Sequence, residues 1–393
     1  MESLTSRYNQ SVIYYLILGF VSIFLISLFL LQIFAALLAI LWLFEKNKQK
    51  IASLDLIGKA LLVFLAARLI AVLFSEYPKI SEEIVYREVL FYLSFFALNF
   101  YLKVLKREKV IKILNVFINA GVVVSLIGIY LFVFNHVHRA QSITSGYSTF
   151  SSYLLVIFIF MLVYSPGKIK NYKSKTWILK LSLIITALVI SLGRTNIFVA
   201  GLILVIFVLS KKVNLKYALI SVLLAGAFSY ASFHFNNKEL ESRVKNPTTL
   251  SDRDIIFKGF EMRYKEHPLL GFGPRTFREI FPLKNQLKDK GVASWHNLYI
   301  EIYMETGLLG LLSFFTLMFA IFYQEIKDYK NRVIDQDSKK VLLSVITSNA
   351  ALYVAALTGG FIFSPILSLQ FAFLLSLGTS VNYWLSKSAG KII

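Results

Sequence analysis

Residues 11–44 read SVIYYLILGFVSIFLISLFLLQIFAALLAILWLF and include no charged side chain. A membrane-spanning helix needs about 20 mostly apolar residues, so this stretch is too long for one span. We therefore expect two helices here, separated near residues 27–32. The stretch predicts an all-α polytopic membrane protein.

The composition of the whole chain agrees with that prediction. Of its 393 residues, 57% are apolar and only 16% are charged, and the mean hydropathy is +0.66. A soluble domain is usually about 25% charged, so the composition excludes a soluble enzyme, a disordered protein and a DNA-binding module. The absence of cysteine excludes disulfides and thiolate metal sites. The short polar segment 1–10 and the long apolar run after it do not form a cleavable signal.

Apolar runs of spanning length recur along the rest of the chain. They raise the expected total to twelve transmembrane helices, the two above being followed by residues 54–74, 84–102, 110–134, 150–164, 177–192, 195–209, 215–233, 297–322, 341–357 and 361–385.

The basic residues give the orientation. The chain has 42 Lys and Arg against 22 Asp and Glu, a net charge of +20 and a pI near 9.8. With a cytoplasmic N-terminus, most of them fall on cytoplasmic segments, and the short outer segments carry only Lys79, Arg139 and Arg194. The charge therefore reflects topology rather than a nucleic-acid partner. The chain divides into helices one to nine (1–233), a large periplasmic loop (234–295) and helices ten to twelve (296–393).

The large loop is the one segment with the composition of a soluble domain. Apolar residues at helical spacing predict an amphipathic helix over residues 252–265, with an N-cap at Ser251-Asp252 and a stop before His267-Pro268. The glycines of residues 271–274 predict a turn, and a second helix is expected over 276–288. Trp295 is expected at the membrane interface, which puts His296 at the mouth of the tenth span.

Three motifs surround this loop: HPLLGFGP at 267–274, HNLYIE at 296–301 and ETGLLG at 305–310. They resemble the O-antigen ligase / O-antigen polymerase family, in which a turn of the form hPllGxGxgtF precedes HNxxLexxxexGllG. The SLGR stretch at 191–194 resembles the "SRg" element of that family, and Arg253 lies where the family usually has an arginine. The motifs cover roughly residues 191–310, while the rest of the chain agrees only in topology.

The resemblance implies a GT-C-like, metal-independent, inverting glycosyltransferase of the bacterial inner membrane with its active site facing the periplasm. It implies a donor glycan on undecaprenyl pyrophosphate and, in a ligase, lipid A–core of lipopolysaccharide as acceptor. In a polymerase the acceptor is another lipid-linked glycan. Chain length and the His-Asn motif favour the ligase, and a protein-glycosylating branch usually has an extra C-terminal domain that is absent here.

The chemistry of such a reaction asks for particular side chains. A diphosphate leaving group without Mg²⁺ must be held by protein cations, and the planar guanidinium of arginine matches phosphate oxygens. The acceptor hydroxyl needs a base or an orienting group, for which histidine is suited near neutral pH. The catalytic candidates are His296, Arg194 and Arg253. Arg194 has an alternative interpretation as a snorkelling interface residue, and Arg253 as a charge neutralised by its flanking aspartates.

Further candidates for binding the pyrophosphate or the substrate are Arg68, Arg87, Arg139, Arg275 and Asn297. Arg68 is an intramembrane charge and so a functional candidate, although it could instead pair with a buried acid. Glu305 is expected to be a structural partner for a basic group. His267 is expected to be structural. No metal-ligand spacing and no glycine-rich phosphate loop occurs in the sequence, so no cofactor is expected.

A rival function from another class is a lipid-linked oligosaccharide flippase or other transporter. It would account for twelve spans and for charge within the membrane. A transporter is expected to show broken spans in two related halves, and no such repeat is visible in the sequence.

Overall fold

The computed structural model describes residues 5–45, 55–164, 175–236, 241, 252–287, 292–331 and 335–388. Every element in these residues is a helix. The long helices are α1 (Thr5–Ser22), α2 (Leu28–Leu43), α4 (Leu56–Leu73), α6 (Glu83–Val104), α7 (Arg107–Val133), α8 (Tyr147–Val163), α9 (Lys175–Ile190), α10 (Arg194–Leu209), α11 (Leu215–Phe235), α16 (Leu298–Lys330), α17 (Gln336–Ala355) and α18 (Leu367–Ser388). The short helices are α5 (Pro78–Ser81), α13 (Arg253–Arg263), α14 (Phe277–Ile280), α15 (Lys284–Leu287) and η3 (Ala356–Thr358).

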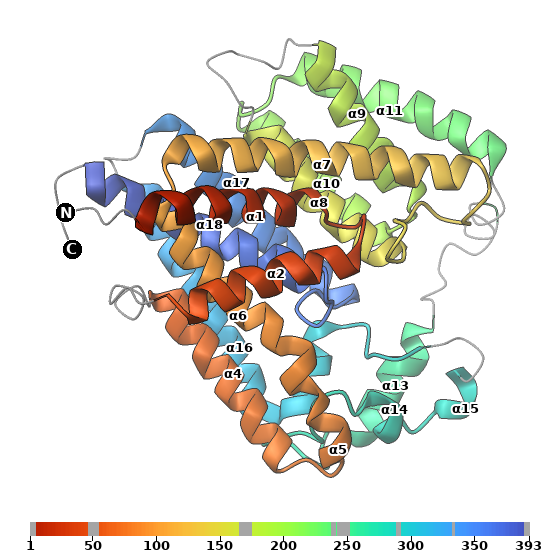
Figure 1. Cartoon of the computed structure of the whole chain (residues 1–393). Coiled ribbons are helices and arrows are strands. Elements are labelled where there is room, and N and C mark those ends of the chain that lie inside the picture. The colour runs from red at the N-terminus through yellow and green to blue at the C-terminus, as the bar shows by residue number, and fades with distance from the viewer. Residues whose placement is uncertain are drawn as a thin grey trace.

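Each of the twelve long helices overlaps one of the predicted spans (Figure 1). Within the described residues, five helices are long and apolar enough to cross a membrane: α4, α7, α11, α16 and α17 extended to Thr358. Five shorter apolar helices accompany them. The all-helical membrane architecture is therefore supported, and crossing of the bilayer by all twelve helices stays a prediction.

The predicted break inside residues 11–44 is present, a few residues earlier than expected. The chain leaves α1 after Ser22, passes through Leu25 at a left-handed φ of 61°, and starts α2 after Ser27. The hydroxyl oxygen of Ser27 accepts a hydrogen bond from the backbone N–H of Leu30, which supplies an N-cap. A local capping side chain thus divides one apolar run into two helices.

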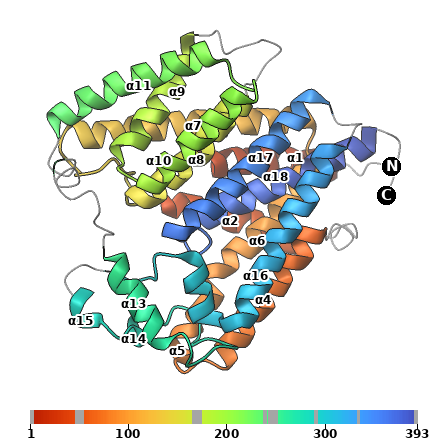
Figure 2. The same cartoon turned by 180° about the vertical axis from the view of Figure 1, so that it is seen from behind.

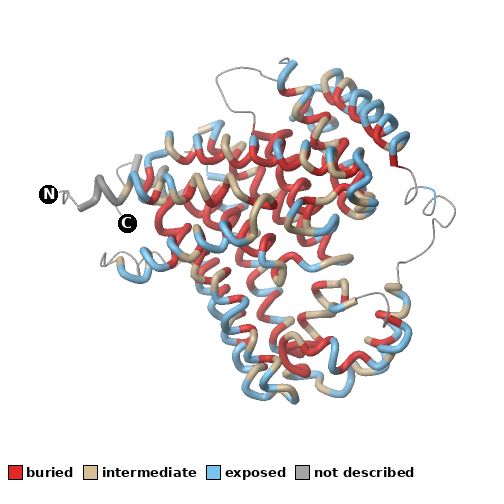
Figure 3. Tube along the Cα trace, turned by 45° about the vertical axis from the view of Figure 1, so that its right-hand side comes forward, coloured by how far each residue is buried: buried red, intermediate tan, exposed pale blue. Residues whose placement is uncertain are grey.

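The core of the bundle is built around α8 and the part of α18 up to Val381, where almost all side chains are buried. Figure 3 shows the buried residues gathered in the middle of the bundle. The most extensive helix pairings are α18 with α6, α16 with α4, and α11 with α9. Figure 2 shows α16 and α4 running side by side away from the central helices toward α5 and the loop helices. The α4–α16 pair therefore links the bundle to the large loop.

The large loop forms a small lobe with its own apolar core, made of Ile256, Phe272, Phe277, Ile280, Phe281, Leu287, Trp295 and Met304. The expected interface position of Trp295 is wrong, because its side chain is 1% exposed and packs edge-on against Phe277. Burial among aromatic rings of the lobe replaces contact with lipid headgroups.

Of the two helices predicted in the large loop, the first is present and the second is not a single helix. The helix expected over 252–265 is present as α13, although Asp252 has a left-handed φ of 62° and its side chain makes no capping hydrogen bond; Ser251 lies outside the described residues. The single helix expected over 276–288 is wrong. It is divided into α14 and α15 by Pro282, which has no N–H to donate and holds Phe281 in an extended conformation.

Candidate active site

The turn that follows α13 is inserted into a break in helix α16. Gly307 interrupts α16 with φ 61° and ψ −159°, so the next two N–H groups cannot reach the carbonyl groups four residues earlier. The turn supplies partners to both sides of the break: Leu308 N–H to Pro268 O (2.8 Å), Leu309 N–H to Leu269 O (3.2 Å), Phe272 N–H to Met304 O (2.9 Å) and Gly273 N–H to Glu305 O (3.0 Å). The loop backbone therefore completes the hydrogen bonding of a membrane helix.

Two glycines make this close approach possible. A Cβ atom added at Gly307 would lie 2.3 Å from the carbonyl carbon of Leu269, and one added at Gly271 would lie 2.5 Å from the carbonyl carbon of Glu305. Both glycines also have left-handed φ values, which other residues adopt at a cost. The glycines of HPLLGFG and ETGLLG thus have a steric explanation, in the joining of turn and helix.

A buried ion-pair cluster lies directly beneath the turn; we call Arg68, Glu88 and Glu305 the site-end cluster. Arg68 donates two hydrogen bonds to the carboxylate of Glu88, at 3.0 and 2.7 Å, and one to Oε2 of Glu305 at 3.1 Å. The other carboxylate oxygen of Glu305 accepts the backbone N–H of Arg275 at 2.7 Å. Helices α4, α6 and α16 are therefore tied to each other and to the turn through one guanidinium group.

Arg68 was a candidate for binding the pyrophosphate, with pairing to a buried acid as the alternative. The structure places its side chain at 0% exposure, with all three guanidinium nitrogens used in the site-end cluster and its charge 4.3 Å from the ring centre of Phe363. The geometry corresponds to the alternative, and Glu305 lies where a structural partner was expected.

A second group of side chains gathers around the end of η3. Arg253, the first residue of α13, donates a hydrogen bond to the carbonyl oxygen of Thr358 at 2.9 Å. The hydroxyl group of Thr358 donates to that of Thr195 at 2.8 Å, and Thr195 follows Arg194 at the start of α10. His296 is near enough to Arg253 for the two charges to interact. The three catalytic candidates therefore come from distant parts of the chain to one end of the molecule.

His296 is partly buried immediately before α16. Burial, and to a smaller extent the positive charge of Arg253, lowers the pKa of its imidazole below the ordinary value. The neutral form, which can accept a proton, is therefore favoured near pH 7.

Several candidate residues of the site have, or lie close to, a left-handed backbone conformation. Among the described residues with a positive φ that are not glycine, Leu192, Asp252, Arg275 and His296 lie on or within two residues of a candidate side chain. Such conformations cost free energy and often occur where a functional side chain must be aimed in one direction.

The remaining candidates have individual environments. Arg194 is exposed at the start of α10, and Arg139 lies 4.3 Å over the ring of Tyr147. Arg87 pairs with Glu83 at 2.8 Å, while Arg275 lies 3.7 Å from the same carboxylate.

Asn297 is the N-cap of α16, where its side chain accepts hydrogen bonds from the backbone N–H groups of Tyr299 and Ile300. His267 pairs with Glu76 at 2.8 Å.

The sequence did not single out two contributors to these arrangements. Glu88 is an ordinary acidic residue in an apolar helix, and Thr358 precedes a pair of glycines between two spans. An intramembrane glutamate is a signal that could have revealed Glu88 as the partner of Arg68. Among the described residues, no group of three or more His, Asp or Glu side chains is placed to hold a metal ion.

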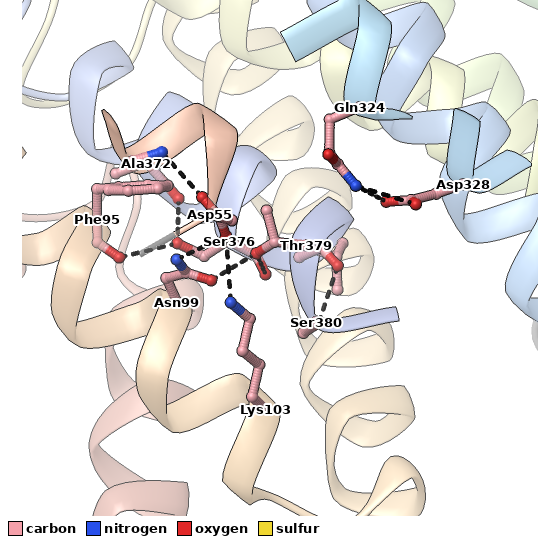
Figure 4. A network of polar contacts seen from close by, with 12 residues as sticks. Asp55, Phe95, Asn99, Lys103, Gln324, Asp328, Ala372, Ser376, Thr379 and Ser380 are labelled. Carbon is pink, nitrogen blue, oxygen red and sulfur yellow. Dashed lines mark hydrogen bonds and ion pairs between the residues drawn. The ribbon is translucent and has the colours of Figure 1, made fainter. Parts of the chain in front are cut away.

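A further polar network joins the start of α4 and the last turns of α6 to the middle of α18 (Figure 4). Asp55 caps α4 by accepting the N–H of Gly58, and its other oxygen accepts hydrogen bonds from Asn99 and Lys103. Asn99 in turn accepts a hydrogen bond from Thr379 of α18. We call Asp55, Asn99, Lys103 and Thr379 the far-end network.

Comparison with known proteins agrees with the motifs. A family model described as O-antigen ligase matches residues 179–315, a range that runs from α9 into α16 and includes Arg194, Arg253, His296 and Gly307. The resemblance to the O-antigen ligase family is thereby confirmed for this part of the chain. No curated protein matches the chain. The match supports an O-antigen ligase- or polymerase-type function in a membrane protein whose substrates are lipid-linked glycans.

Proposed function

We propose that the protein is an inner-membrane O-antigen ligase. It transfers a glycan from undecaprenyl pyrophosphate to a hydroxyl group of lipid A–core at the periplasmic face. The observation that carries this proposal is the chain of hydrogen bonds from Arg253 through Thr358 to Thr195, the neighbour of Arg194, together with the effect of the charge of Arg253 on the imidazole of His296. A neutral imidazole and two arginines gathered at one end of the molecule suit the transfer of a glycan from a diphosphate.

Arg194 and Arg253 hold the departing diphosphate. Both are the first residues of helices, α10 and α13, whose N-terminal N–H groups also favour a phosphate group. The leaving group is already a good one, so the protein contributes mainly by positioning it and neutralising its growing negative charge. The guanidinium group of Arg253 is already held by its hydrogen bond to Thr358.

His296 acts on the acceptor. Its neutral imidazole takes the proton of the acceptor hydroxyl as the oxygen attacks the anomeric carbon. The new bond joins that carbon to the acceptor oxygen, and the bond from the same carbon to the diphosphate oxygen breaks. Undecaprenyl pyrophosphate leaves with the electron pair, and a single displacement inverts the anomeric configuration.

The site-end cluster contributes to this chemistry indirectly, by fixing the chain around the candidate catalytic residues. It holds Glu305 and the turn at residues 268–273 in one place, and Arg275 is bonded to the same carboxylate through its N–H. Arg87, Arg139, Arg275 and Asn297 remain proposed contacts to the lipid-linked substrate or to the chain around it.

One reconstitution experiment tests the proposal. Purified protein in lipid vesicles is incubated with a lipid-linked glycan and lipid A–core, with EDTA and without nucleotide, and extension of the core is followed on a gel. We expect product from the wild type and a loss of about 100-fold or more in His296→Ala and Arg253→Ala. Lys258→Ala, an exposed basic position on the same helix as Arg253, and His234→Ala are matched controls expected to keep full activity.

The alternatives give different products in the same assay. Lengthening of the glycan on the lipid carrier, with unmodified core, identifies the polymerase. Movement of the lipid-linked glycan between leaflets without any transfer identifies the flippase. Full activity of both His296→Ala and Arg253→Ala contradicts the assignment of the catalytic residues.

A further inference from the structure

Three polar residues share one face of α16 at four-residue spacing: Asn297, Glu301 and Glu305. The first caps the helix and the third belongs to the site-end cluster. Glu301 lies between them, is partly exposed, and makes no hydrogen bond or ion pair through its carboxylate with any residue that the structure describes. A carboxylate in the first turn of a membrane helix is costly unless something meets it.

The segment that faces Glu301 contains two consecutive glycines, Gly359 and Gly360. A Cβ atom added at Gly360 would lie 3.6 Å from Oε2 of Glu301, and one added at Gly359 would lie 3.8 Å from the hydroxyl oxygen of Ser148. Gly360 and Ser148 are exposed. Paired glycines of this kind let a ligand approach the backbone closely.

The same chain reaches the diphosphate end of the site. Thr358, whose carbonyl oxygen accepts the hydrogen bond from Arg253, is two residues from Gly360. Consecutive Cα atoms are about 3.8 Å apart, so the Cα atoms of Thr358, beside Arg253, and of Gly360, beside Glu301, are at most about 8 Å apart. This is the scale of one sugar ring beside a phosphate.

We propose that Glu301, together with Gly359, Gly360 and Ser148, forms the subsite for the acceptor sugar. The carboxylate of Glu301 accepts hydrogen bonds from hydroxyl groups of that sugar and orients it toward His296. This proposal rests on the proposed transferase function and names the part of the site that receives the acceptor sugar.

The hydrogen-bonding groups of Glu301 decide which substrate it meets. Its carboxyl group brings no positive charge for the diphosphate of the donor, for which the protein already offers Arg194 and Arg253. Its oxygens can accept hydrogen bonds from sugar hydroxyl groups. The hydroxyl of Ser148 and the backbone of the two glycines add neutral polar contacts that suit a saccharide.

Steady-state kinetics with each substrate varied separately tests the subsite. For Glu301→Gln we expect the KM for lipid A–core to rise about tenfold or more, a factor that corresponds to about 1.4 kcal/mol. The KM for the lipid-linked glycan and the kcat should change less than about threefold. Glu261→Gln, an exposed glutamate on α13, is the matched control and should leave all three constants unchanged.

A second variant approaches the subsite from the other side. Gly360→Val places a bulky side chain in front of the carboxylate at a position where an added Cβ meets only ordinary contacts, so the fold should tolerate it. It should also raise the KM for the acceptor selectively. Binding of lipid A–core without donor, measured by thermophoresis, should weaken in both variants.

The outcomes separate the two proposals. If the wild type transfers no glycan, the proposed function fails. If the wild type is active and both variants keep the wild-type KM for the acceptor, only the subsite is overturned. A fall in kcat with an unchanged acceptor KM in Glu301→Gln also overturns it, because the residue would then act in the chemical step.

Discussion

Helices α4 and α6 carry a charged cluster at each end, and the two clusters differ in what they are attached to. At the site end, Arg68 joins Glu88 to Glu305, and the backbone of the large loop is bonded to the same carboxylate. At the far end, Asp55 joins Lys103 and Asn99 and is attached to helices only. The helical rise of about 1.5 Å per residue separates Arg68 from Asp55 by about 20 Å along α4.

Helix α16 shows the same contrast in its two buried glutamates. Glu305 faces a guanidinium group, whereas Glu325 receives one hydrogen bond from the amide of Asn349, and its other oxygen has no hydrogen-bond partner among the described residues. The difference indicates that a buried ion pair is placed in α16 where the loop must be held in one position, and that an amide hydrogen bond to Glu325 is sufficient where α16 packs only against another helix.

The largest expected effect is at the break in α16. Gly307→Ala places a Cβ atom against the backbone of Leu269, which would expel the turn and remove four hydrogen bonds worth about 1 kcal/mol each. We expect loss of activity and a loss of stability of about 4 kcal/mol, measured by chemical unfolding in detergent. Gly201→Ala, in α10 with open space around its Cβ, is the control and should unfold like the wild type or slightly later.

The two basic residues give the next test. Arg68→Met leaves the carboxylates of Glu88 and Glu305 buried without a cation and should cost about 3–5 kcal/mol of unfolding free energy. Lys103→Met should cost less than about 2 kcal/mol, because Asp55 is partly exposed and keeps its bonds from Gly58 and Asn99. Equal losses in the same unfolding assay would remove the distinction between the two ends.

Replacing each of the two buried glutamates of α16 by glutamine tests whether the two ends of that helix differ in the same way. Glu305→Gln removes one ion pair with Arg68 and should cost about 1–3 kcal/mol. Glu325→Gln keeps the oxygen that accepts the amide of Asn349 and should change stability by less than about 1 kcal/mol. A larger loss in Glu325→Gln would show that the far end of α16 depends on an ionised carboxylate.

A titration of His296 gives a smaller effect. Its lowered pKa means that the unfolded chain takes up a proton before the folded one, so stability falls as the pH drops below about 6.5. Exchange of the imidazole C2 hydrogen, followed by mass spectrometry, should have its midpoint below 6.5. In Arg253→Gln the midpoint should move upward, and an unchanged midpoint would mean that Arg253 does not act on the imidazole.

The smallest effect is expected at an exposed ion pair between α7 and α17. Arg107 and Asp335 lie 2.6 Å apart, but both side chains are about 40% exposed. Arg107→Ala should change the unfolding free energy by less than about 1 kcal/mol. The melting temperature in detergent at low and high salt measures this effect.

Much of this architecture could be predicted from the sequence because apolar length is a local property. The eleven apolar runs, the division of the first of them near Ser27 and the helix α13 all follow from neighbouring residues. The division of the second loop helix could also have been predicted from Pro282, which cannot donate a backbone hydrogen bond.

The site was less accessible because it depends on contacts between distant segments. His296 and Arg253 were identifiable from their motifs, but the break at Gly307 exists only because residues 268–273 supply its hydrogen bonds. Thr358, Gly359 and Gly360 carry no charge and resemble any other turn between spans. Their position beside Arg253 and Glu301 became visible only when the helices were packed together.

The hydrogen-bond exchange between the turn and α16 has a consequence for the order of folding. The turn precedes α16 in the chain, so a ribosome delivers residues 268–273 before the helix that needs them. Without that turn, a break at Gly307 would leave the carbonyl groups of Met304 and Glu305 and the next two N–H groups unpaired beside lipid, at several kcal/mol each, so α16 cannot take its broken form before the turn is in place. The last quarter of the protein, which begins with α16, is therefore expected to reach its final packing only on a loop that has already folded.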